Sequence, residues 1–387
     1  MKKLFVLFFV VLLVVSTVMI PIASAANSTQ SQKMIVIFAD GKVNKDIIHT
    51  AKGKINKEYK HLNALAVTLP ENSINDLANT PGVIKVEPDF VFTASGKPTP
   101  TPTPPPVIPG QTTDWGVDRV KAPTAWANEN TGEGVNIAVL DTGIALHPDL
   151  TIAGGVAITG SSYFDDNGHG THVAGIIAAM DNNIGVIGVA PKANLYAVKV
   201  LDSQGSGYVS DVVAGIDWAI DNNINIINLS LGSSSYSSLL EDAVNTAYSK
   251  GILLVAAAGN SGTKRTTLEN VEYPAKFGSV IAVAATGADL YNSRASFSST
   301  GIEVEVSAPG VNIKSTYLNN SYATMSGTSM ATPMVAGDLA LLIQANRKLT
   351  TPLTITDLRL LVLDQRVKDL GATGKDNLYG YGLIQAQ

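Results

Sequence analysis

Four polar residues carry side chains that together suit acyl transfer. In chain order they are Asp141 in "AVLDTGI", His169 in "NGHGTHVAG", Asn260 in "AAAGNSG" and Ser329 in "SGTSMATP". A serine hydroxyl is a weak nucleophile at neutral pH, so it needs an imidazole as its base and a carboxylate to orient that imidazole. A side-chain amide can stabilise the charge that develops on the attacked carbonyl oxygen. The set therefore predicts catalysis with Ser329 as the nucleophile.

Each of these residues also has a purely structural interpretation. Ser329 precedes an apolar stretch with helical spacing, so capping a helix would account for it. Asp141 and Asn260 stand next to glycines, where turn formation is sufficient. His169 and His172 are three residues apart on one predicted helix and suit a shared metal ion, but no third protein ligand and no intervening glutamate accompany them.

Short apolar runs and helical segments alternate from Gln111 onwards. Continuous apolar runs predict buried strands, and apolar residues three or four apart predict helices. The predicted strands are 135–140, 194–200, 224–229, 252–258 and 279–285, and the predicted helices are 172–180, 209–220, 239–250 and 334–348. This alternation predicts an α/β fold with a parallel sheet covered by helices. Ligands bind beyond the carboxyl ends of such strands, which is where Asp141 and Asn260 stand.

Three different segments precede this region. Residues 1–25 have the layout of a signal peptide, with two lysines, an apolar stretch over 4–22 and a small-residue cleavage site at 23–25; an uncleaved membrane anchor is the alternative. Residues 34–93 predict a small α+β unit, with strands at 34–39, 61–69 and 83–92 and helices at 46–55 and 71–80. Residues 96–110 are rich in proline and predict an extended linker, with a ligand for a proline-binding module as the alternative.

The composition excludes some classes of function. The chain has no cysteine, so it forms no disulfide and no thiolate metal site. Its net charge of −5 argues against a nucleic-acid binder, which would normally carry a basic face. We therefore expect an exported, extracellular protein that is stabilised without disulfides.

The four blocks around Asp141, His169, Asn260 and Ser329 resemble the signature blocks of the subtilisin family of serine peptidases. The resemblance covers residues 111–387, including "YPAKFGSVIAVAA" and "YGYGLIQA", and residues 34–93 are similar to the inhibitory propeptide of that family. It implies a subtilisin-like parallel sheet covered by helices on both faces, preceded by a small α+β (ferredoxin-like) propeptide domain. It also implies a secreted serine endopeptidase that cleaves proteins through an acyl-enzyme and is made as a self-processing zymogen.

The resemblance assigns roles to individual residues. It makes Ser329 the nucleophile, His169 the general base and then acid, and Asp141 the carboxylate that orients His169. The Asn260 amide and the Ser329 N–H form the oxyanion hole, and His172 is structural. Aligning "VIKVEPDFV" with the family's closing propeptide strand implies a cut within a few residues of Ser95.

The resemblance also implies a substrate cleft. Two edge strands hold the substrate between them; one contains Gly205, Ser206 and Gly207, and the other contains Ser230, Leu231 and Gly232. A pocket lined by Ala257, Ala258 and Gly259 receives the substrate residue before the cut. Glu272 stands where many members of the family have glycine at the foot of this pocket. Its carboxylate either faces the pocket and favours Lys or Arg in the substrate, or turns outward to solvent or to Lys276 or Arg265.

A structural calcium site is implied by "MDNNIGV" at residues 180–186. The ligands are the side chains of Gln111, Asp149 and Asn182 and the carbonyls of Met180, Ile184 and Val186. All are oxygen donors, as a hard cation requires. The alternative is an asparagine-rich surface turn.

Two other classes of function remain to be distinguished from a monomeric endopeptidase. One is a catalytically inactive binding scaffold, and the other is a serine hydrolase that acts on esters. A serine-directed phosphonate followed by a casein digest separates them, because a scaffold is not labelled and an esterase is labelled without cleaving protein.

Overall fold

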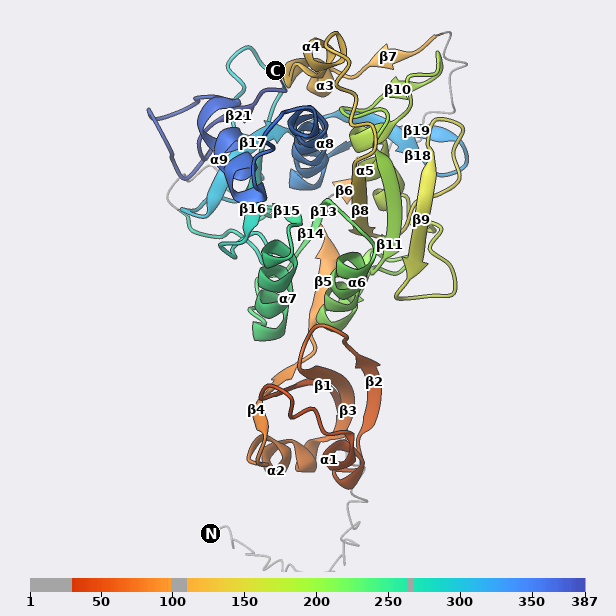
Figure 1. Cartoon of the computed structure of the whole chain (residues 1–387), viewed down its shortest axis with the longest axis vertical. Coiled ribbons are helices and arrows are strands. Elements are labelled where there is room, and N and C mark those ends of the chain that lie inside the picture. The colour runs from red at the N-terminus through yellow and green to blue at the C-terminus, as the bar shows by residue number, and fades with distance from the viewer. Residues whose placement is uncertain (1–29, 96, 99–109, 264–267, 387) are drawn as a thin grey trace, which may run out of the picture.

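The computed structural model describes residues 30–95, 97–98, 110–263 and 268–386 (Figure 1). The predicted signal peptide 1–25 lies outside these residues, as does most of the predicted linker 96–110. None of the helices in the described residues is long and apolar enough to span a membrane.

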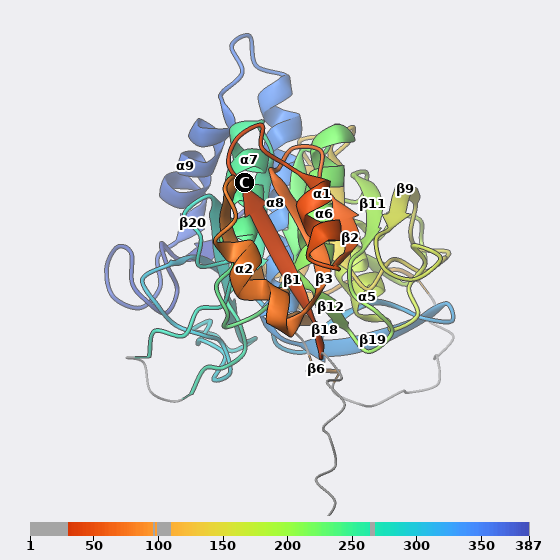
Figure 2. The same ribbon diagram turned by 90° about the horizontal axis from the view of Figure 1, so that it is seen from below.

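The N-terminal unit is an antiparallel sheet with two helices on one face. Its elements are β1 (Ser31–Phe38), α1 (Lys45–Thr50), β2 (Lys54–Glu58), β3 (Ala64–Pro70), η1 (Glu71–Ser73), α2 (Ile74–Ala78) and β4 (Val83–Pro88). The strand order β2-β3-β1-β4 with two crossover helices is the ferredoxin-like arrangement, which confirms the predicted α+β unit. Figure 2 shows α1 and α2 on the face of this sheet that points away from the rest of the molecule.

One predicted helix of this unit is wrong in its extent. The expected helix 46–55 ends at Thr50, and Lys54 already belongs to β2. Lys52 adopts a left-handed backbone with φ of 57°, which ends the helix. A Cβ on Gly53 would lie 2.5 Å from Leu69 Cδ2, so a larger residue here would displace the Leu69 side chain on β3.

The C-terminal unit is built on a nine-stranded sheet in the order β20-β21-β17-β16-β15-β13-β8-β11-β9. Adjacent strands are parallel from β21 to β9, and β20 runs antiparallel to β21. The strands are β8 (Asn136–Asp141), β9 (Ile152–Ala157), β11 (Asn194–Lys199), β13 (Ile226–Leu229), β15 (Leu253–Ala257), β16 (Val280–Thr286), β17 (Val304–Pro309), β20 (Val367–Lys368) and β21 (Leu383–Ile384). The five strands predicted from apolar runs are all present.

Helices cover both faces of this sheet, as predicted. One face packs against α5 (His169–Ala178) and α8 (Thr328–Arg347), and the other against α6 (Val209–Asp221) and α7 (Ser238–Ser249). Three further helices lie at the periphery (Figure 1): α3 (Trp115–Arg119), α4 (Ala122–Trp126) and α9 (Ile355–Gln365). Two separate apolar cores result, one on each side of the sheet.

Short strands connect the two units. After β4 the chain forms β5 (Val91–Ala94), which lies antiparallel between β12 (Ser206–Tyr208) and β14 (Leu231–Gly232). Beyond it, β6 (Lys97–Pro98) pairs with β19 (Ser321–Ser326), whose other neighbour is β18 (Ile313–Tyr317). A further parallel pair joins β7 (Thr112–Thr113) to β10 (Val186–Ile187).

Candidate active site

The parallel sheet and the first turn of α5 bring Asp141 and His169 together. Asp141 is the last residue of β8 and His169 is the first of α5. His169 Nδ1 lies 2.8 Å from Asp141 Oδ1 and 2.9 Å from Oδ2, and both side chains are buried. The Thr142 N–H also donates to Asp141 Oδ1 at 2.7 Å, so the carboxylate is held from two sides.

The carboxylate makes His169 a stronger base. Burial alone would lower the pKa of His169, but the charge of Asp141 and its hydrogen bond more than offset this, so the pKa is raised above its ordinary value. The other ring nitrogen, Nε2, is buried and has no hydrogen-bond partner among the described residues. Asp141 therefore fixes the orientation of the His169 ring through Nδ1, and Nε2 is left to accept a further hydrogen bond.

Ser329 is the second residue of α8 and is buried. Its Oγ donates to the carbonyl of Ser230 at 2.9 Å, and Ser230 Oγ donates back to the Ser329 carbonyl at 3.0 Å. Within the part of the chain that the structure describes, no hydrogen bond joins Ser329 Oγ to His169 Nε2. The Ser329 hydroxyl is therefore directed at the Ser230 carbonyl in this structure.

Asn260 follows β15 and its amide is oriented by Thr328. Asn260 Oδ1 accepts hydrogen bonds from Thr328 N at 2.9 Å and from Thr328 Oγ1 at 3.1 Å. The other end of the amide, Nδ2, donates to the backbone carbonyl of Ser95. The Ser329 N–H lies in the first turn of α8, where no helical carbonyl can accept it.

Strand β5 occupies the cleft between the two predicted edge strands. Thr93 pairs with both Ser206 and Gly232, so β5 forms the middle strand of a three-stranded sheet. The Ala94 N–H donates to Gly205 O at 2.9 Å, and the Ser95 N–H donates to Ser230 O at 3.1 Å. All six predicted cleft residues therefore flank β5. Ser206 and Gly207 belong to β12 and Gly205 precedes it, whereas Leu231 and Gly232 form β14 and Ser230 precedes it.

Two of the predicted pocket residues, Ala258 and Gly259, contact Glu272. Ala257 and Ala258 are fully buried at the end of β15, and Ala258 O accepts from Glu272 N at 2.9 Å. A Cβ on Gly259 would lie 2.7 Å from Glu272 Cδ, so the Glu272 side chain packs against this glycine. Lys276 instead pairs with Glu303 at 3.6 Å, and Arg265 lies outside the described residues.

His172, one turn after His169, points elsewhere. Its Nε2 lies 3.1 Å from Ile313 O and 3.0 Å from Ala323 O, in the β18–β19 region. Complete burial lowers the pKa of His172 to about 3, so the ring stays neutral. The two histidines therefore have different surroundings, which argues against a shared metal ion.

The predicted calcium ligands converge around the loop 180–186. Gln111 Nε2 donates to Met180 O at 2.5 Å and to Val186 O at 3.0 Å, and Asn182 Oδ1 accepts from Ile184 N at 3.1 Å. Asp149 Oδ1 is buried without a partner among the described residues, and burial raises the pKa of Asp149 to about 6.

This oxygen-rich environment fits a hard cation. The oxygen and nitrogen of an amide are assigned by their hydrogen bonds, and turning the Gln111 amide over would direct its oxygen toward the same two carbonyls. A Cβ on Gly185 would lie 1.9 Å from the Tyr322 hydroxyl and 2.5 Å from Asp149 Oδ2, so the loop closes tightly over the carboxylate. A cation would satisfy the orphaned Asp149 oxygen.

Two carboxylates of the N-terminal unit cap helices of the C-terminal unit, which the sequence analysis missed. Glu87 accepts from Ser237 Oγ at 2.6 Å and from Ser238 Oγ at 2.8 Å at the start of α7. Asp89 accepts from Ser210 N at 3.0 Å and Ser210 Oγ at 2.8 Å at the start of α6. In the sequence, the only sign of these contacts is that two acidic residues stand near a predicted domain boundary. Their serine partners are more than 120 residues further along the chain, so the pairing could not be predicted.

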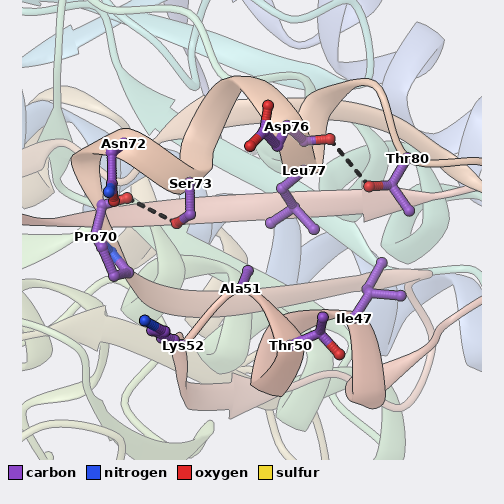
Figure 3. Close-up of a pocket in the computed structure, with 10 residues that line it drawn as sticks. All are labelled: Ile47, Thr50, Ala51, Lys52, Pro70, Asn72, Ser73, Asp76, Leu77 and Thr80. Carbon is purple, nitrogen blue, oxygen red and sulfur yellow. Dashed lines mark hydrogen bonds between the residues drawn. The ribbon is translucent and has the colours of Figure 1, made fainter.

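A separate cavity of about 450 Å³ lies between α1 and α2 (Figure 3). The hydroxyls of Ser73 and Thr80 in its lining donate to backbone carbonyls of Pro70 and Asp76. The lining contains no histidine, and the cavity lies on the far side of the N-terminal unit from Ser329.

Comparison with known proteins matches two family models to the chain. The profile of the subtilase family matches residues 132–382, and that of peptidase inhibitor I9 matches residues 20–95. The chain is 44% identical over 368 residues to the minor extracellular protease Epr of Bacillus subtilis (strain 168), covering 94% of this chain and 55% of that relative. It is 50% identical over 279 residues to Subtilisin Savinase of Lederbergia lenta, covering 72% of this chain and 98% of the relative. It is 42% identical over 366 residues to a thermostable alkaline protease of Halalkalibacterium halodurans, with 94% and 93% covered.

Proposed function

This chain belongs to the subtilase family, and we propose that it is a secreted, monomeric serine endopeptidase made as a self-processing zymogen. Its N-terminal unit is a peptidase inhibitor I9 domain, which acts as an intramolecular inhibitor. Export is supported by the signal-like layout of residues 1–25 and by a relative that is named an extracellular protease.

In the proposed mechanism, Ser329 attacks the substrate carbonyl and transfers its proton to His169 Nε2. Asp141 keeps the proton of the imidazole on Nδ1 and stabilises the imidazolium that forms. The Asn260 amide and the Ser329 N–H stabilise the oxyanion. His169 then protonates the leaving amine, and water hydrolyses the acyl-enzyme by the same steps in reverse roles.

The hydrogen bond from Asn260 to Ser95 O is the observation that carries this proposal. It puts a peptide carbonyl at the amide expected to stabilise an oxyanion, while β5 lies in the cleft as a substrate strand would. We therefore propose that the first substrate is the chain itself, cleaved after Ser95.

A phosphonate that reacts with activated serines tests the function. Labelling of Ser329 together with casein cleavage supports an endopeptidase. Labelling without cleavage of casein would favour an ester hydrolase, and absence of labelling would favour a binding scaffold.

We also propose that one Ca²⁺ stabilises the fold without taking part in catalysis. Gln111, Asp149 and Asn182 would hold it with the carbonyls of Met180, Ile184 and Val186. The orphaned, buried Asp149 oxygen supports this proposal. The cation would tie the segment before α3 to the loop after α5, a contribution that a protein without disulfides needs.

A further inference from the structure

Resting on the proposed endopeptidase function, we propose that Glu272 is a specificity-determining residue that selects Lys or Arg immediately before the cut. The substrate class would then be proteins and peptides with exposed basic residues.

The Glu272 side chain lies between the cleft and the pocket wall. A Cβ on Gly232, in strand β14, would lie 2.4 Å from Glu272 Oε2 and 3.2 Å from Ser95 Oγ. The carboxylate and the side chain of the residue before the cut therefore meet at the same glycine. On the other side, a Cβ on Gly259 would lie 2.9 Å from Glu272 Cγ. Two glycines thus make room for this carboxylate in the cleft.

The Glu272 carboxylate has a single weak polar partner. Ser261 Oγ donates to Oε1 at 3.2 Å, and among the described residues no cation pairs with Glu272. Burial raises the pKa of Glu272 above its ordinary value. A half-buried carboxylate with so little compensation gains from a cation brought by the substrate.

The propeptide does not supply a cation to pair with the Glu272 carboxylate. Its residue before the proposed cut is Ser95, whose side chain is short and neutral, although it is buried at this position. A lysine or arginine there would extend its aliphatic stem past Gly232 and reach the carboxylate with its charged end. The resulting charge-assisted hydrogen bond would improve kcat/KM by about tenfold to a hundredfold over a neutral residue of similar size.

A peptide series that varies only the residue before the cut tests this proposal. Peptides with Phe-Thr-Ala before that position copy residues 92–94 of β5, and the variable residue is Lys, Arg, Gln or Leu. We expect the wild type to prefer Lys and Arg, and Glu272→Gln to lose at least tenfold of the Lys-to-Leu ratio of kcat/KM. Glu269→Gln, a neighbouring exposed carboxylate, is the matched control and should keep the wild-type ratio.

The outcomes separate this inference from the proposed function. Phosphonate titration of Ser329 gives the concentration of active enzyme in each variant, so misfolding does not enter the ratio. A Glu272→Gln enzyme that still cleaves the Leu peptide keeps the endopeptidase intact while isolating the specificity effect. The same Lys-to-Leu ratio of kcat/KM in the wild type and in Glu272→Gln would overturn the inference. It would also be overturned if this ratio changed only in an Arg265→Ala variant. Failure of the wild type to cleave any peptide would contradict the proposed function instead.

Discussion

The side-chain amide of Asn260 donates a hydrogen bond to the backbone carbonyl of Ser95, 165 residues earlier in the chain. The N-terminal unit is thereby bound as a substrate would be, with its own carbonyl facing the amide that Thr328 orients. In the proposed function, inhibition and self-processing would therefore use the same contacts.

Ser329→Ala should accumulate as an uncut protein that begins near Ala26, because no other serine is activated by His169. The wild type should instead release a fragment ending at Ser95 and a mature chain beginning at Gly96. Intact-mass spectrometry of both proteins measures this. Added wild-type enzyme should process the variant, and maturation of Ser329→Ala alone would refute self-cleavage.

Replacing Asn260 with alanine should lower kcat by about 10²- to 10³-fold, the range known for the corresponding donor in subtilisins, with little change in KM. The amide acts on charge that develops in the transition state, so substrate binding is nearly unaffected. Steady-state kinetics on one peptide measures both constants. A rise in KM at constant kcat would show that Asn260 only binds the substrate.

Activity should fall as the pH drops through the pKa of His169, because a protonated imidazole cannot accept the Ser329 proton. Asp141 raises that pKa, so Asp141→Asn should move the acid limb of kcat/KM to lower pH. It should also lower kcat by about 10⁴-fold, since the imidazole tautomer is no longer held. An unchanged acid limb in Asp141→Asn would contradict the contact between Asp141 and His169.

Removal of calcium should lower the melting temperature of the mature enzyme. A ligand present at 100 times its dissociation constant stabilises a fold by about 2.7 kcal/mol, or about 5 °C for a domain of this size. Calorimetry with and without a chelator measures the difference. Asp149→Asn should abolish it and Asp181→Asn, in the same loop, should preserve it; equal melting of the wild type in both buffers would remove the site.

Glu87→Ala and Asp89→Ala should each shorten the lag before activity appears, because each removes a cap that joins the propeptide to α7 or α6. Loss of a helix cap costs about 0.5 to 2 kcal/mol, which corresponds to about 2- to 30-fold weaker binding of the propeptide. Release of a chromogenic peptide during maturation gives the lag. Glu71→Ala, in η1, is the control, and an unchanged lag in all three variants would exclude a role for the caps.

Local features of the sequence were sufficient for the main elements of the fold. The run "VNIAVL" predicts β8 because a short continuous apolar run is typical of a strand that is buried on both faces. The order of Asp141, His169, Asn260 and Ser329 indicated acyl transfer because each residue type has a distinct chemical requirement. Prediction failed where the signal is short or irregular. β9, which was not predicted, contains two glycines that interrupt its apolar pattern.

Side-chain direction and pairing between distant segments were decided by the tertiary structure alone. The sequence left two directions open for Glu272, and the space next to Gly232 and Gly259 determines which one it takes. The Ser329 hydroxyl and the Ser95 N–H both donate to the carbonyl of Ser230, and the three residues come from distant parts of the chain. Hydrogen bonds and steric limits act over a few ångströms in space, whereas these partners are separated by many residues in the chain. The sequence by itself therefore determined which residues and elements are present, and only the fold decided which atoms face one another.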